Sequence, residues 1–131
     1  MDLTELFKDS KIENLALEAR KLTIDISKEL YNEETNTMEL TNKSICFDMV
    51  DFVASSLIIL DINYDTNEVK GRLVELIDFS NSNLTINVFE CTASSNTLKF
   101  EGIIKKGDDF KNAILSLYYF DGAVVSDKIV N

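Results

Sequence analysis

The sequence predicts an α+β fold, with one or two N-terminal helices packed on a curved antiparallel β-meander of five to six strands. Apolar residues recur at spacings of three and four over residues 11–31. From Leu57 onward they alternate with polar residues, and short polar segments typical of turns separate the alternating runs. Because no linker, repeat or low-complexity segment divides the chain, we expect a single domain, 1–131, that is mainly helical over 1–56 and an antiparallel sheet over 57–131.

The clearest predicted element is a helix from about Lys11 to Tyr31. Ser10 and Glu13 have the S-x-x-E spacing of a capping box at its start. An apolar stripe follows at helical spacing, with charged residues on the other face; the stripe consists of Ile12, Leu15, Ala19, Leu22, Ile26 and Leu30. We expect a short helical turn at Leu3–Lys8 before this helix, and the polar loop Asn32–Thr37 to end it.

Residues 38–56 fit two interpretations. A second helix over Asn42–Ser56 is favoured, because Ile45, Met49 and Phe52 recur at helical spacing, followed by Val53. The alternative is a strand with one face formed by Ile45, Phe47, Met49 and Asp51.

The second part of the chain reads as successive strands joined by short turns, which favours antiparallel pairing. The expected strands are Leu57–Tyr64, Val69–Phe79, Leu84–Thr92, Thr97–Lys105, Lys111–Phe120 and Ala123–Val130. In the first of them, the alternation places Ile58, Leu60, Ile62 and Tyr64 on one face. Asp121-Gly122 predicts a two-residue hairpin between the last two strands.

The negative charge of the chain is concentrated in one stretch. Between Glu29 and Glu68 there are nine acidic residues and the single base Lys43, which together supply −8 of the net charge of −10. The negative electrostatic potential of such a stretch attracts a basic protein partner and repels nucleic acid. The same charge is equally well explained by a role in solubility alone. We expect the contact face to comprise Glu33, Glu34, Glu39, Asp48, Asp51, Asp61 and Asp65, with Tyr119 as an aromatic anchor.

Catalysis is disfavoured, because the chain has no histidine and none of the common phosphate-binding, nucleophile or metal-binding motifs. We expect no cofactor and no catalytic or metal site. One pair of carboxylates is the alternative candidate for a catalytic or ligand-binding site. Glu75 and Glu90 share strand phase with apolar neighbours, so they would face a common cavity with Tyr118 or Tyr119, unless each lies solvated at a sheet margin.

The sequence therefore predicts a non-catalytic protein-binding module, an acidic inhibitor of the immunity or phage-antagonist type that engages a basic partner surface. The alternatives are a structural protein that assembles into oligomers, and a small-ligand binder or carboxylate enzyme in a cupped sheet. We expect a cytoplasmic protein without direct nucleic-acid or membrane contacts, since the N-terminus lacks a secretory signal and no apolar run could span a bilayer. Cys46 and Cys91 are expected to be small buried side chains.

Overall fold

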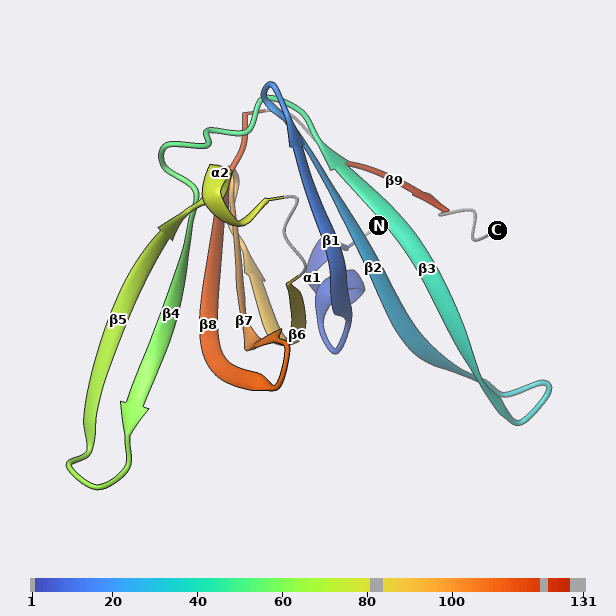
Figure 1. Ribbon diagram of the computed structural model, residues 1–131. Coiled ribbons are helices and arrows are strands. Elements are labelled where there is room, and N and C mark those ends of the chain that lie inside the picture. Colours follow the sequence, from blue (N-terminus) through green and yellow to red (C-terminus); the bar gives the residue numbers. More distant parts are fainter. Residues whose placement is uncertain (1, 81–83, 121–122, 128–131) are drawn as a thin grey trace.

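The computed structural model describes residues 2–80, 84–120 and 123–127. These residues form one antiparallel sheet of nine strands in the order β5-β4-β8-β7-β6-β1-β2-β3-β9 (Figure 1). The strands are β1 (Lys11–Glu18), β2 (Lys21–Asn32), β3 (Thr37–Phe47), β4 (Ser56–Asn63), β5 (Glu68–Glu75), β6 (Thr85–Ala93), β7 (Thr97–Lys106), β8 (Asp109–Tyr118) and β9 (Ala123–Asp127). Two short helices accompany them, α1 (Leu3–Phe7) and α2 (Leu76–Phe79).

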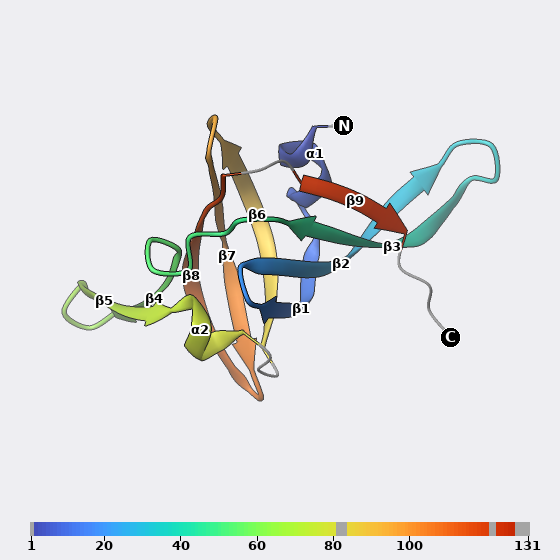
Figure 2. The ribbon, with the colours of Figure 1, turned by 90° about the horizontal axis from the view of Figure 1, so that it is seen from above.

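The sheet is bent into two halves that enclose the core. Strands β1 and β6 connect the halves through the pairs Lys11–Asn87 and Ile12–Ile86. Seen from above, strands β6, β7 and β8 of one half run crosswise to β1, β2 and β3 of the other (Figure 2). Both halves contribute apolar side chains to the buried core; they include Leu22, Ile24, Ile45 and Phe47 from one half and Leu57, Phe100, Leu115 and Leu117 from the other. Burial of this surface between two crossed sheet layers is the main stabilising contribution.

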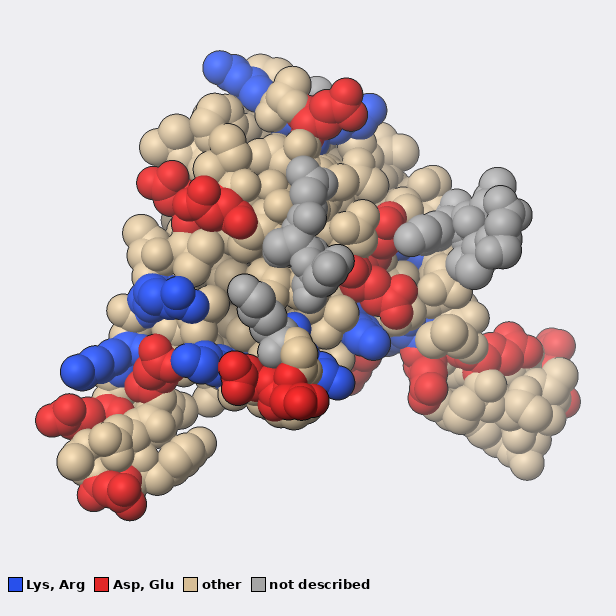
Figure 3. Space-filling model, viewed as in Figure 1, with Lys and Arg blue, Asp and Glu red and all other residues tan. Residues whose placement is uncertain are grey.

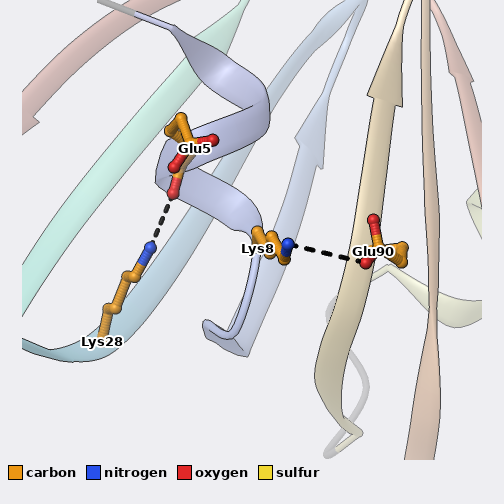
Figure 4. A network of polar contacts seen from close by, with 4 residues as sticks. All are labelled: Glu5, Lys8, Lys28 and Glu90. Carbon is orange, nitrogen blue, oxygen red and sulfur yellow. Dashed lines mark hydrogen bonds and ion pairs between the residues drawn. The ribbon is translucent and has the colours of Figure 1, made fainter.

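Helix α1 places the aromatic ring of Phe7 between the two halves of the sheet. The Phe7 side chain is fully buried, with its ring centroid 4.6 Å from that of Phe100 and 6.5 Å from that of Phe47. Polar contacts fix the helix on both sides (Figure 4): the Lys28 ammonium of β2 donates to the Glu5 carbonyl at 2.6 Å, and Lys8 lies 3.7 Å from the Glu90 carboxylate of β6.

The predicted helix from Lys11 to Tyr31 is wrong, because this segment is the hairpin β1–β2. The pairing register shifts between Ile12 and Asn14, and the resulting β-bulge puts Ile12 and Leu15 on the same face of β1. Leu22 and Ile26 lie on one face of β2 for a different reason, because every second residue of a strand does. A bulge and a strand together therefore produced spacings of three and four that imitate a helix.

Ser10 and Glu13 do not form a capping box. The Ser10 hydroxyl donates to the Phe7 carbonyl at 2.6 Å and is buried behind α1, whereas Glu13 accepts a hydrogen bond from the Ser27 hydroxyl at 3.1 Å. The short helical turn predicted at Leu3–Lys8 is confirmed as α1, whose N-cap is Asp2.

The helix favoured over Asn42–Ser56 is also wrong. Residues up to Phe47 belong to β3, where Ile45 and Phe47 are buried, as the strand alternative required. A loop follows over residues 48–55; it turns at Met49 with φ of 57° and is fixed where the Asp51 N–H donates to the Tyr118 carbonyl at 2.8 Å. The α+β prediction fails for this reason: residues 2–56 are mainly sheet, and the core is covered by the second half of the sheet rather than by helices.

The strands expected after Leu57 are found, with three corrections; of the last one, Ala123–Val130, residues 128–130 lie outside the described residues. The buried side chains of β4 are Leu57 and Ile59, so the face predicted from Ile58, Leu60, Ile62 and Tyr64 points away from the core. Residues Leu76–Phe79 form α2 instead of extending the strand before them. The order is not a simple meander, since β4 and β5 lie outside β8, and β9 pairs with β3. The predicted turn Asp121-Gly122 lies outside the described residues.

The turn between β1 and β2 offers a test of this hairpin. Ala19 has φ of 55°, a left-handed conformation that costs a non-glycine residue about 1–2 kcal/mol. Glycine adopts it freely but loses about 0.5–1 kcal/mol through greater freedom of the unfolded chain. We expect Ala19→Gly to raise the free energy of unfolding by roughly 0.5 kcal/mol in urea titrations. Ala16→Gly, at a strand position of β1, should lower it; a loss of stability in both variants would contradict the turn geometry.

Candidate functional site

The β2–β3 hairpin extends beyond its neighbouring strands as a two-stranded ribbon. Strand β1 pairs with β2 only up to Ser27, and β9 pairs with β3 from Lys43 onward. Residues 28–41, here called the arm, therefore pair only with each other among the residues that the structure describes. Figures 1 and 2 show the arm projecting from the body of the protein. Two-stranded hairpins are only marginally stable alone in water, so a partner that covers the arm would stabilise it.

The arm combines acids with exposed apolar side chains. Its acids are Glu29, Glu33, Glu34 and Glu39, and its apolar side chains are Leu30 (48% exposed), Tyr31 (54%), Met38 (58%) and Leu40 (62%). The register places the pairs Tyr31–Met38 and Glu29–Leu40 on one face and the pair Leu30–Glu39 on the other. Exposed aromatic and aliphatic side chains surrounded by charge are typical of protein-binding surfaces.

A groove of about 630 Å³ lies at the root of the arm. One wall comes from the arm and β2, the other comes from β6, and the chain entering β1 completes it. The lining residues that matter for recognition are Glu29, Met38 and Leu40 on the first wall, Phe89 on the second, and Asp9, Lys11 and Glu13 between them. Lys28 also borders the groove, but its ammonium is directed at the Glu5 carbonyl of α1 (Figure 4).

The predicted acidic residues do not form one contact face. Glu33, Glu34 and Glu39 lie on the arm, Asp61 and Asp65 lie on or beside the β4–β5 hairpin, and Asp48 and Asp51 lie in the loop after β3. Figure 3 shows the two hairpins on opposite sides of the molecule, each with its own acidic group. The sequence stretch is continuous, but the bend of the sheet divides it in space.

Three of these acids already have partners within the chain, since Glu39 on the arm accepts a hydrogen bond from the Asn32 side-chain amide at 3.0 Å. The Asp51 carboxylate accepts the backbone N–H groups of Val53 and Ala54 at 3.1 and 3.0 Å and so fixes its own loop. The Lys111 ammonium donates to the Asp61 carboxylate, and this hydrogen bond is the main reason that the pKa of Asp61 lies below its ordinary value. The contacts of Asp51 and Asp61 tie these acids to the body of the protein, whereas the contact of Glu39 lies within the arm.

Tyr119 is not an exposed anchor. Its side chain is half-buried, and its ring centroid lies 5.2 Å from that of Phe47, at the margin of the core. The aromatic residue that the sequence analysis missed is Tyr31, which had been placed at the end of a helix. The signal that could have indicated an exposed hairpin comes after the polar turn, where the apolar residues Met38 and Leu40 alternate with Thr37, Glu39 and Thr41.

Glu75 and Glu90 do not share a cavity. They lie on β5 and β6, which are separated by β4, β8 and β7, and both side chains are exposed. Glu90 forms its ion pair with Lys8. Within residues 2–80, 84–120 and 123–127, no group of three or more acidic, cysteine or histidine side chains could hold a metal ion.

Both cysteines are free thiols. Cys91 is buried, as expected, whereas Cys46 is half-buried. Desolvation, reinforced by the negative charges of Asp2 and Glu90, raises the pKa of the Cys91 thiol to about 12. Cys91 is therefore a neutral, structural side chain at physiological pH.

Strand β5 is a second open edge, but its charges oppose self-pairing. In the described part of the chain it pairs only with β4, and Lys70 and Arg72 lie on one face, alternating with Val69 and Leu73. If two copies paired antiparallel through β5, the registers with the longest overlap would bring Lys70 or Arg72 opposite each other or opposite their own copies. Like charges in opposite positions destabilise a strand pair, and edge lysines are a common protection against association.

Removal of this protection should be measurable. We expect Lys70→Thr combined with Arg72→Thr to make the average mass in sedimentation equilibrium rise with protein concentration more steeply than in the wild type. Lys21→Thr combined with Lys99→Thr changes the net charge equally on interior strands and should leave that dependence unchanged. Equal behaviour of the two variants would show that the charges of β5 have no special role.

No protein-family model, curated protein or solved structure matches this chain. Among the described residues, no helix is long and apolar enough to cross a membrane.

Proposed function

We propose that this protein is a non-catalytic binding module that uses the arm to engage a basic surface of another protein. The observation that carries the proposal is the composition of the arm, in which four acids and four exposed apolar side chains project from the body of the protein. Solubility alone would account for the acids. It would not account for Tyr31, Met38 and Leu40 beside them, because exposed apolar surface lowers solubility.

Charge and apolar surface have different roles in this proposal. The acids raise the association rate by attracting a basic partner, an effect that weakens with salt. The apolar side chains would supply most of the binding free energy once they are desolvated against the partner, with Tyr31 as the aromatic residue among them. The arm therefore contains both parts of a protein-binding surface.

The β4–β5 hairpin is a poorer candidate for the same role. Lys70, Arg72 and Lys111 lie on or beside it and offset its acids, including Asp61. On the arm, the only base is Lys28 at the root, and its ammonium is engaged with α1. A basic partner is therefore attracted more strongly to the arm.

An acidic inhibitor of the immunity or phage-antagonist type, directed against an enzyme with a basic cleft, fits this surface best. We place its action in the cytoplasm, since two free thiols without a disulfide suit a reducing compartment. Assembly into oligomers is the second candidate; the unpaired edge of the arm favours it, whereas the net charge of −10 opposes association between copies.

The proposal is tested by charge reversal on the two hairpins. The immobilised protein should capture a basic protein from extracts of the source organism at low salt, and the association rate of that protein should fall as salt increases. Glu33→Lys, Glu34→Lys and Glu39→Lys together should reduce the association rate at least tenfold. The matched control is Asp65→Lys, Glu68→Lys and Glu75→Lys, three exposed acids on and beside the other hairpin. Equal rates for the two triple variants would remove the arm from the proposal.

A further inference from the structure

The groove at the root of the arm lies where β1 leaves the sheet. Strand β1 pairs with β2 as far as Lys11–Ser27, and the chain then turns away through Ser10 toward α1. The next residues of β2, 28–32, pair with β3 on one side and with no described residue on the other. In the described part of the chain no strand lies beside residues 28–32 on this side, and the groove borders this position.

The edge of β6 that faces the same region is already occupied. The Asp9 N–H donates to the Val88 carbonyl at 3.0 Å, and the Val88 N–H donates to the Ser10 carbonyl at 2.9 Å. An extended segment entering the groove therefore finds its free backbone partners on β2. On β6 it meets the side chain of Phe89, which is about half exposed.

The side chains around the groove define what such a segment would carry. Three acids line the groove, namely Asp9, Glu13 and Glu29. The two lysines of the lining are Lys11 and Lys28, and the Lys28 ammonium is engaged with the Glu5 carbonyl. The lining is therefore acidic. Met38, Leu40 and Phe89 provide apolar surface on the same groove. The lining therefore favours basic and apolar side chains on the same face of the entering segment, at positions i and i+2.

We propose that this groove binds an extended segment of a partner protein as an added strand on the free edge of β2, with basic side chains directed at Glu13 and Glu29 and apolar side chains packed against Leu40 and Phe89. The inference rests on the proposed protein-binding function and specifies how the partner is held. Main-chain hydrogen bonds to alternate residues of 28–32, whose N–H and C=O groups point away from β3, would supply affinity. The groove would select the side chains, as in other cases of strand addition. The added strand would also cover the open edge of an otherwise marginal hairpin.

A synthetic peptide tests the mode of binding directly. The probe T-R-T-V-T-R-T-V-T places arginine and valine alternately on one face, and T-E-T-V-T-E-T-V-T is its acidic counterpart. A third peptide replaces the central threonine by proline, which removes a backbone donor and disfavours strand pairing. Titration of the ¹⁵N-labelled protein should shift the amide signals of residues 28–32 and Phe89. It should slow hydrogen exchange at least tenfold at the alternate residues of 28–32 whose N–H groups point away from β3.

Substitutions at exposed positions give matched comparisons that do not threaten folding. Glu29→Lys and Phe89→Ala should each weaken binding of the basic peptide at least tenfold, whereas Glu68→Lys and Phe110→Ala, which lie outside the groove, should not. Any of three results would overturn the groove proposal. The acidic peptide could bind as tightly as the basic one, hydrogen exchange at residues 28–32 could stay unchanged at millimolar peptide, or the signal changes could be confined to β5.

The two proposals fail separately. Phe89 lies on β6 and not on the arm, so it matters only if the groove is used. A captured basic protein that depends on Glu33, Glu34 and Glu39 but tolerates Phe89→Ala would leave the arm as the binding site and eliminate strand addition at its root. Loss of both dependences would eliminate both proposals.

Discussion

Replacement of Gly102 by alanine is expected to lower the free energy of unfolding by about 3 kcal/mol, the upper end of the usual cost of overpacking a core. An added Cβ at this position would lie 2.0 Å from the Asn87 carbonyl oxygen and 3.1 Å from the Val88 Cα. Both are backbone atoms of β6, next to its bulge between Val88 and Glu90. Relief of the clash would require β6 and β7 to separate, so no side-chain rotation can absorb it.

Gly71→Ala is the matched control. Its Cβ would meet only the side chains of Ile58 and Leu60, at 3.4 and 3.7 Å, which is ordinary van der Waals contact. Because alanine also reduces the freedom of the unfolded chain, this variant should be as stable as the wild type or slightly more stable. Urea titrations followed by far-ultraviolet circular dichroism measure both variants. Similar stability of the two would show that β6 does not approach β7 as closely as the structure places it.

Whether a strand is regular or contains a β-bulge determined which parts of the fold could be predicted. From Leu57 onward, the alternation of apolar and polar residues located most strands, because regular strands have a fixed period of two. In residues 11–31 the bulge at Ile12 and Asn14 interrupted that period and produced helical spacing. This bulge is a property of the pairing of β1 with β2, so the residue pattern along β1 alone contains little information about it.

Pairing between distant segments also explains the errors at the candidate site. The acids from Glu33 to Asp65 were predicted to converge because they are close in sequence, yet β4–β5 and β2–β3 lie at opposite sides of the sheet order. The charge and the exposed apolar residues of the arm are properties of composition and could be read from the sequence. The groove could not, because it depends on where β1 leaves β2 and on the position of β6 across the bend.

Replacement of Phe7 by alanine is expected to have the largest effect of a single truncation, because this side chain connects both halves of the sheet. It is fully buried and contacts Phe100 from one half and Phe47 from the other. Removal of a buried phenylalanine side chain typically costs about 3–5 kcal/mol, a large part of the roughly 5–15 kcal/mol that stabilises a domain. Phe110→Ala is the control, since Phe110 is exposed and its ring centroid lies 5.4 Å from the Lys105 ammonium, so its loss should cost less than about 1 kcal/mol.

The Phe7 variant also tests whether the core supports the binding site. The buried Phe7 side chain holds α1 in place, and the Glu5 carbonyl of α1 accepts a hydrogen bond from Lys28 at the root of the arm. Asp9 and Ser10, which follow α1, pair with the edge of β6. Loosening of α1 should therefore speed hydrogen exchange at Lys28 and Asp9 more than at the distant strand β4. Phe7→Leu refills much of the space and should restore most of the stability and the slow exchange. Equal acceleration in β4 would mean that Phe7 stabilises the domain as a whole and does not specifically position the root of the arm.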